Sequence, residues 1–85
     1  MILKVFATEE DFENDYLIEI IERAEEEGYT VEKLDTDSEE AHLQTELYNI
    51  YVSPSFVVAG VDGTEIESWR GRIPPLGDVM EFLSR

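Results

Sequence analysis

Apolar residues follow two different spacings along this chain, and the order of those spacings limits the folds it can adopt. Residues 2–7 form a mostly apolar run of strand length, as expected for a central strand covered on both faces. Over residues 15–27 the apolar positions recur every three or four residues, which predicts an amphipathic helix. Residues 29–34 form a second strand. A strand, a helix and a strand with short links imply a parallel pair joined by a right-handed crossover.

Residues at the expected ends of this first helix support its limits. Asn14 or Asp15 can cap its start with a side-chain oxygen, and Gly28 is suited to end it. Farther along, Asp37-Ser38-Glu39-Glu40 offers a side-chain cap with Glu40 three residues after Asp37. This pattern opens a second helix, which we expect to run to about Tyr48. Four of its apolar residues can face a core: Ala41, Leu43, Leu47 and Ile50.

The last third of the chain predicts a hairpin and a closing helix. Residues 56–59 form a buried strand, and Asp62-Gly63 is a strong turn signal before a strand over residues 64–70. After Pro74-Pro75 the apolar residues regain helical spacing: Leu76, Val79, Met80 and Leu83. The whole pattern predicts one α/β domain over residues 1–85 with the order βαβαββα.

The sequence contains no cysteine and carries a formal net charge of -15, from 21 acidic and 6 basic residues. Without a thiol the chain can form no disulfide, no thiolate metal site and no thiol nucleophile. Its charge repels polyanions, so we expect neither nucleic acid nor an anionic membrane as a partner. A basic or neutral protein or peptide is the favoured partner, although the charge can also serve solubility alone.

Other site classes and a membrane location are not indicated. His42 and Glu46 form an ordinary surface pair one helical turn apart, and the acids of residues 9–15 lack the spacing of a calcium loop. We therefore expect no metal and no cofactor. No apolar run reaches the roughly 18 residues that span a bilayer, and the first ten residues do not resemble a signal peptide, which predicts a cytoplasmic protein.

Several stretches resemble the thioredoxin and glutaredoxin family. Residues 31–37, Val-Glu-Lys-Leu-Asp-Thr-Asp, are similar to that family's second strand and following turn. Residues 48–56, Tyr-Asn-Ile-Tyr-Val-Ser-Pro-Ser-Phe, resemble its approach to a cis-proline, which here is Pro54. Gly63 and Gly71 bracket the last strand as in the family's hairpin.

The resemblance covers residues 2–83, including a terminal helix similar at Val-Met-Glu-Phe-Leu, residues 79–83. It implies a compact, glutaredoxin-sized thioredoxin-like fold. This fold has a four-stranded mixed sheet with helices on both faces, and a cis peptide bond precedes the proline.

The place of the family's reactive cysteines differs here. In active members a C-x-x-C motif follows the first strand, where a helix N-terminus lowers the pKa of a thiol. In this chain residues 8–15 read Thr-Glu-Glu-Asp-Phe-Glu-Asn-Asp, without cysteine or serine. Thiol-disulfide exchange is therefore excluded by chemistry. The resemblance also aligns Lys4 with the buried acid that thioredoxins use for proton transfer.

The resemblance implies a peptide-binding groove at Pro54. In the family the backbone of the residue before the proline, here Ser53, pairs with an extended peptide as an added strand. Such pairing uses main-chain groups and survives loss of the cysteines. Val52, Ser53 and Pro54 are therefore candidate partner-binding residues. The alternative is that Pro54 only ends a helix and begins a strand.

Two charged segments are expected to border this groove. The one concentrated basic stretch is Trp69-Arg70-Gly71-Arg72, and in the family the loop bearing the equivalent of Gly71 lies against the cis-proline. The acidic turn would form the opposite wall with Glu9, Glu10, Asp11 and Glu13. The two walls either pair with each other or hold a partner that carries both signs of charge. For Trp69, core packing is the alternative to partner contact.

Two functions and an assembly role stay open. The leading hypothesis is a redox-inactive thioredoxin-like module that binds a protein or peptide, with no catalytic residue. The second is a protein or enzyme that binds glutathione or a similar small acid, because residues 62–68 resemble the segment that holds the γ-glutamyl end of glutathione in transferase N-terminal domains. A free sheet edge could also form a homodimer, although we expect a monomer.

Overall fold

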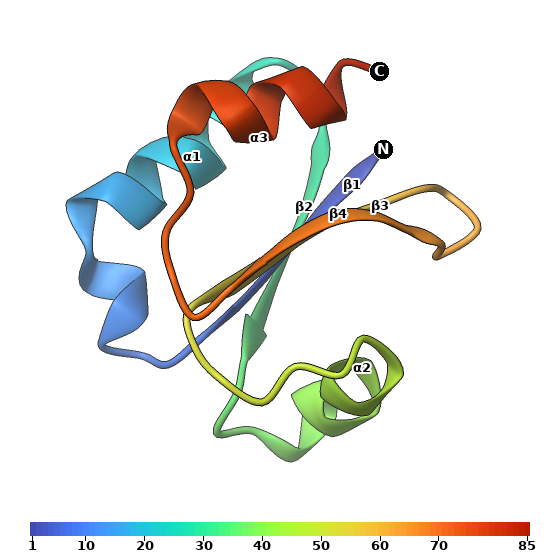
Figure 1. Cartoon of the computed structure of the whole chain (residues 1–85). Coiled ribbons are helices and arrows are strands. Elements are labelled where there is room, and N and C mark those ends of the chain that lie inside the picture. Colours follow the sequence, from blue (N-terminus) through green and yellow to red (C-terminus); the bar gives the residue numbers. More distant parts are fainter.

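The computed structural model describes all 85 residues, and its elements follow the order βαβαββα (Figure 1). The strands are β1 Ile2–Ala7, β2 Thr30–Asp35, β3 Ser55–Ala59 and β4 Glu65–Arg70. The helices are α1 Asp15–Glu26, α2 His42–Leu47 and α3 Leu76–Leu83. Single 3-10 turns precede the first two helices: η1 Asp11–Glu13 and η2 Glu39–Ala41. The predicted α/β fold and element order are confirmed.

The four strands form one mixed sheet in the order β2-β1-β3-β4. Strand β1 is parallel to β2 and antiparallel to β3, and β3 is antiparallel to β4. In this register Ala7 is paired with Asp35, while Ser55 is paired with both Phe6 and Arg70. The loops that follow β1, β2 and β4 and the loop that precedes β3 therefore meet at one end of the sheet.

Helices cover both faces of the sheet, with α1 and α3 on one side and α2 on the other (Figure 1). Alternate residues of β1 therefore enter different hydrophobic clusters. Leu3, Val5 and Ala7 pack with α1 and α3, whereas Phe6 packs with Tyr48 and other residues on the α2 side. Burial on both faces explains why β1 is a nearly continuous apolar run in the sequence.

The local signals at the ends of α1 act as expected. The Asn14 side chain accepts hydrogen bonds from the backbone N–H groups of Tyr16, at 2.9 Å, and Leu17, at 3.4 Å. Gly28 follows the helix with a φ of 87°, a backbone conformation that glycine adopts without a steric cost. The apolar face of α1 is buried through Leu17, Ile20, Ile21 and Ala24.

The second helix is shorter than predicted, and two of its residues do not face the core. The segment from Ser38 to Tyr48 forms η2 followed by α2, and Ala41 is buried as expected. Leu43 and Leu47, however, are 81% and 69% exposed, so their assignment to the core was wrong. The face of the sheet beneath α2 is already covered by five buried residues: Phe6, Tyr48, Ile50, Val57 and Ala59.

None of the helices combines the length and the apolar character needed to cross a lipid bilayer.

Candidate functional site

The loop before β3 lies at the end of the sheet where the other loops meet. Its Ser53-Pro54 peptide bond is cis, as the resemblance predicted. Ser53 and Pro54 are half-buried, and Val52 is exposed. The loop therefore presents its backbone and the Val52 side chain at this end of the sheet.

A buried hydroxyl joins this loop to the loop that follows β4. Ser55 Oγ donates to the carbonyl oxygen of Val52 at 2.7 Å and accepts from the backbone N–H of Gly71 at 3.1 Å. Gly71 has a φ of 75°, and a Cβ atom there would lie 3.1 Å from Val52 Cγ2. Glycine thus permits both the backbone conformation and the close approach of the two loops. The resemblance placed this loop against the cis-proline, and the structure shows it in contact with Val52 and Ser55, on either side of Ser53-Pro54.

The main chain of Ser53 differs from that of Val52 in its hydrogen bonding. Neither its N–H nor its carbonyl oxygen forms a hydrogen bond within the chain. The Val52 carbonyl, by contrast, is already bound to Ser55. Ser53 therefore offers one donor and one acceptor at a half-buried position, which is the arrangement that strand addition uses.

A pocket of about 370 Å³ adjoins Ser53 on the α2 side of the loop. One wall comes from α2 and the loop after β2, and the other comes from the loop before β3. The lining residues are Thr36, His42, Thr45, Glu46, Ile50, Tyr51, Val52 and Ser53. A side chain of a bound segment could enter this pocket next to the free backbone groups.

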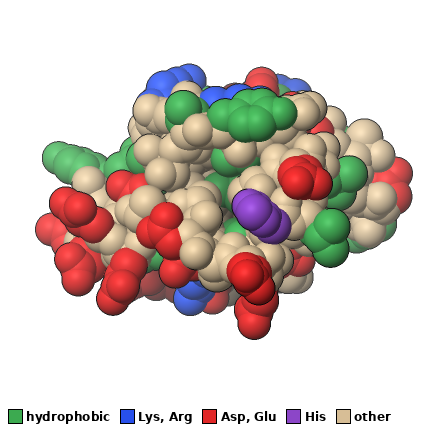
Figure 2. All heavy atoms as spheres, turned by 90° about the horizontal axis from the view of Figure 1, so that it is seen from below, with side chains coloured by type: hydrophobic (Ala, Val, Ile, Leu, Met, Phe, Trp, Pro, Cys, Tyr) green, Lys and Arg blue, Asp and Glu red, His purple; other side chains and the backbone are tan.

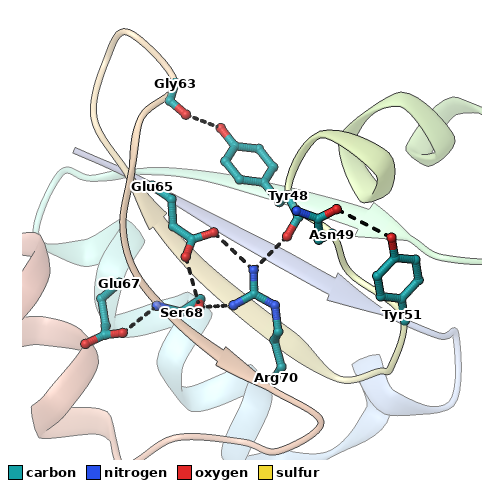
Figure 3. A network of polar contacts seen from close by, with 8 residues as sticks. All are labelled: Tyr48, Asn49, Tyr51, Gly63, Glu65, Glu67, Ser68 and Arg70. Atoms are coloured by element: carbon teal, nitrogen blue, oxygen red, sulfur yellow. Dashed lines mark hydrogen bonds and ion pairs between the residues drawn. The ribbon is translucent and has the colours of Figure 1, made fainter.

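The Arg70 side chain forms hydrogen bonds and an ion pair within the protein (Figure 3). Its guanidinium donates to the backbone carbonyl of Tyr48 at 2.6 Å, to Glu65 at 3.1 Å and to the hydroxyl of Ser68. In Figure 3 the side chain reaches from β4 toward the segment that follows α2. Arg70 therefore fastens that segment to the sheet instead of facing the acidic turn.

The other residues of the basic stretch differ in their surroundings. Trp69 is 6% exposed and packs edge-on against Phe82, with ring centroids 5.8 Å apart, so the structure favours core packing for it. Arg72 is exposed and forms no ion pair. Arg72 is thus the one charged residue of this stretch left for contact with a partner.

The acidic turn is partly used for local structure. Asp11 accepts a hydrogen bond from the N–H of Thr8, and the Thr8 hydroxyl accepts one from the N–H of Asp11, both at 3.1 Å. This reciprocal pair closes the turn of residues 8–11 that leads into η1. Glu9 and Glu10 are exposed, and none of the acids in the turn pairs with Arg70 or Arg72. The two predicted walls do not close the groove by pairing with each other.

Lys4 occupies a buried position in the sheet on the side of α2. Its ammonium lies 2.6 Å from Glu32 and 3.0 Å from the side-chain oxygen of Gln44, and 5.4 Å from the centre of the Tyr48 ring. The side chain is 7% exposed. Lys4 thus ties β1 to β2 and α2.

Two contacts in this region were not found by sequence reasoning. The sequence contains only a weak signal for the two hydrogen bonds of the Ser55 hydroxyl. A serine at the start of an otherwise apolar strand needs a hydrogen-bond partner for its hydroxyl. The Thr8–Asp11 pair had a clearer signal, since Thr-x-x-Asp is the spacing of a reciprocal cap. No group of three or more potential metal ligands comes together.

The sequence matches no protein-family model, and no curated protein matches it. The fold and the geometry at Ser53 are therefore the features that bear on function.

Proposed function

We propose that this chain is a redox-inactive member of the thioredoxin-like proteins that binds an extended segment of a protein or peptide beside Pro54. Thiol-disulfide exchange is excluded because the sequence has no cysteine. Binding by strand addition needs only main-chain donors and acceptors, so it does not depend on a thiol.

The observation that carries this proposal is the unpaired main chain of Ser53. Ser53 is a half-buried residue whose N–H and carbonyl have no partner in the chain, so water or a ligand must satisfy them. The Ser55 hydroxyl holds the neighbouring Val52 carbonyl and the Gly71 N–H, so the loop is ordered before a partner arrives. Such preorganisation reduces the entropy lost on binding.

Charged side chains without ion pairs lie around the loop, and they favour a partner that carries both positive and negative groups. Arg72 and the side chains of Glu9 and Glu10 have no ion-pair partner in the chain. They belong to loops that end at the same end of the sheet as Ser53. We infer that an acidic group of the partner meets Arg72 and that a basic group meets the acidic turn.

Selection from a random peptide library followed by charge reversal tests this proposal. We expect the selected peptides to shift the amide resonances of residues 51–54 and 71–73. Arg72→Glu should weaken their binding about tenfold. Lys33→Glu is the matched control, because Lys33 is also exposed and without an ion pair but lies on the edge strand β2, at the other side of the sheet. Equal effects of the two variants, or shifts confined to other residues, would refute the proposed groove.

The pocket beside Ser53 favours a second candidate function, the binding of glutathione or a similar small acid. Its volume of about 370 Å³ is in the range of small-molecule sites. Titration with glutathione separates the two functions. Clustered amide shifts at residues 52–56 and 67–68 would favour the small ligand, and an unchanged spectrum would favour the peptide.

A further inference from the structure

Helix α2 presents an apolar face that the fold does not use. Leu43 and Leu47 are one helical turn apart, and both point outward, at 81% and 69% exposed. Residues at this spacing form a ridge on one side of a helix. Figure 2 shows the α2 side of the molecule, where green hydrophobic side chains lie among red carboxylates near the purple histidine.

Packing within the chain does not account for this ridge. The sheet face beneath α2 is filled by the cluster around Phe6 and Tyr48, and both of these residues are at most 5% exposed. Exposed leucines placed singly are normal on protein surfaces. Leu43 and Leu47, however, lie on the same short helix and point away from the cluster around Phe6 and Tyr48. Such a pair of exposed leucines indicates a surface that a partner covers.

The charge around the ridge limits what that partner can be. Residues 34–69 contain no lysine or arginine. Their acidic residues are Asp35, Asp37, Glu39, Glu40, Glu46, Asp62, Glu65 and Glu67. Three of these glutamates belong to η2 or α2, and all three are exposed and without ion pairs: Glu39, Glu40 and Glu46. In Figure 2 the blue basic side chains appear only at the margins.

We propose that the outer face of α2, formed by Leu43 and Leu47 and flanked by Glu39, Glu40 and Glu46, docks a basic amphipathic helix of a partner protein. Apolar residues of the partner at a spacing of three or four would pack on the two leucines, and its lysines or arginines would meet the glutamates. A second copy of this chain is a poor occupant, because it would bring two sets of the same carboxylates together.

The small size of the face predicts weak and readily reversible binding. Two leucines bury much less area than the roughly 800 Å² per partner of a stable complex. The attraction between opposite charges would therefore supply much of the association rate, and salt would weaken binding. Glu46 also lines the pocket beside Ser53, but Leu43, Leu47, Glu39 and Glu40 do not belong to the groove at Ser53.

The test uses a synthetic leucine-lysine peptide of about 18 residues that forms an amphipathic helix. A scrambled peptide of the same composition serves as the control for net charge. We expect the amphipathic peptide to bind and to shift the amides of residues 39–47. The double variant Leu43→Ala, Leu47→Ala should weaken its binding about tenfold or more. Val61→Ala is the matched variant, because Val61 is 89% exposed in the β3–β4 turn and should leave binding unchanged.

Each other outcome would overturn this proposal. Equal binding of the scrambled peptide would mean that charge alone is responsible. Loss of binding on Val61→Ala, or no loss on the double leucine variant, would exclude the ridge. A concentration-dependent dimer that the leucine substitutions abolish would make a second copy the occupant. Arg72→Glu should not weaken binding of the leucine-lysine peptide. The experiment can therefore refute docking on α2 without refuting segment binding at Ser53, and the reverse.

Discussion

A single hydroxyl group holds the two loops of the proposed groove together. Ser55 is fully buried, and its Oγ binds one backbone group from each loop. The side chain does not face a partner, so its role is to position Val52 and Gly71. Ser53, which lies between Val52 and Pro54, is thereby held with its own backbone groups free.

Removal of this hydroxyl should therefore destabilise the protein. We expect Ser55→Ala to lower the free energy of unfolding by about 1 to 3 kcal/mol, because a carbonyl and an N–H lose their partner. Ser84→Ala is the control, since Ser84 also donates to a backbone carbonyl but is exposed, and it should cost less than about 0.5 kcal/mol. Urea denaturation would measure both. Equal losses would contradict a special role for Ser55.

Asp62 provides a prediction about pH. The backbone N–H and the hydroxyl of Thr64, each 3.0 Å away, lower the pKa of the Asp62 carboxyl. A carboxyl group whose pKa is lower in the folded state than in the unfolded state stabilises the folded protein at pH values above the unfolded pKa of about 3.9. This stabilisation is lost as the pH falls through the folded-state pKa. Asp62→Asn should therefore be less stable than the wild type at pH 6, and the difference should shrink toward pH 2. A difference that is constant with pH would contradict this.

At the scale of elements, polar contacts help to hold α2 and the residue after it, Tyr48, to the sheet. A helix of six residues has little stability of its own. Lys4 reaches Gln44 from β1, Arg70 reaches the Tyr48 carbonyl from β4, and the Tyr48 hydroxyl donates to the Gly63 carbonyl at 2.6 Å. These contacts place the helix where its other face is available to a partner.

The ion pair of Lys4 should matter more for stability than the pairs on the surface. Glu32→Gln leaves a buried ammonium without its carboxylate, and we expect a loss of about 1 to 3 kcal/mol. Glu81→Gln breaks the exposed pair with Arg85 and should cost less than about 0.5 kcal/mol. Thermal or urea unfolding would compare the two variants. A smaller loss for Glu32→Gln would mean that Lys4 is satisfied by Gln44 alone.

Periodicity was sufficient to predict the elements but not the inner and outer sides of every helix. The strong apolar face of α1 and the caps at Asn14 and Gly28 are local signals, and the structure agrees with them. Leu43 and Leu47 were assigned to the core because spacing alone does not reveal that Tyr48 and Ile50 fill the available sheet face. Whether Arg70 turns toward the acidic turn or toward Tyr48 depends on tertiary contacts, which a sequence pattern does not encode.

At the scale of the whole molecule, two surfaces are proposed to bind partners. One is the end of the sheet at Ser53, where four loops meet, and the other is the outer face of α2. The first has free main-chain groups and charges of both signs, whereas the second has two leucines flanked by three glutamates. A net charge of -15 favours approach of a basic partner to either surface and makes association sensitive to salt.

The central claim, that Ser53 binds an extended segment through its main chain, is tested most directly by N-methylation of a selected peptide at one residue after another. Strand addition predicts that methylation of the N–H facing the Ser53 carbonyl weakens binding about tenfold or more, whereas methylation of the next residue, whose N–H points away, is tolerated. Tolerance at every position would contradict the account, because binding would then depend on side chains alone.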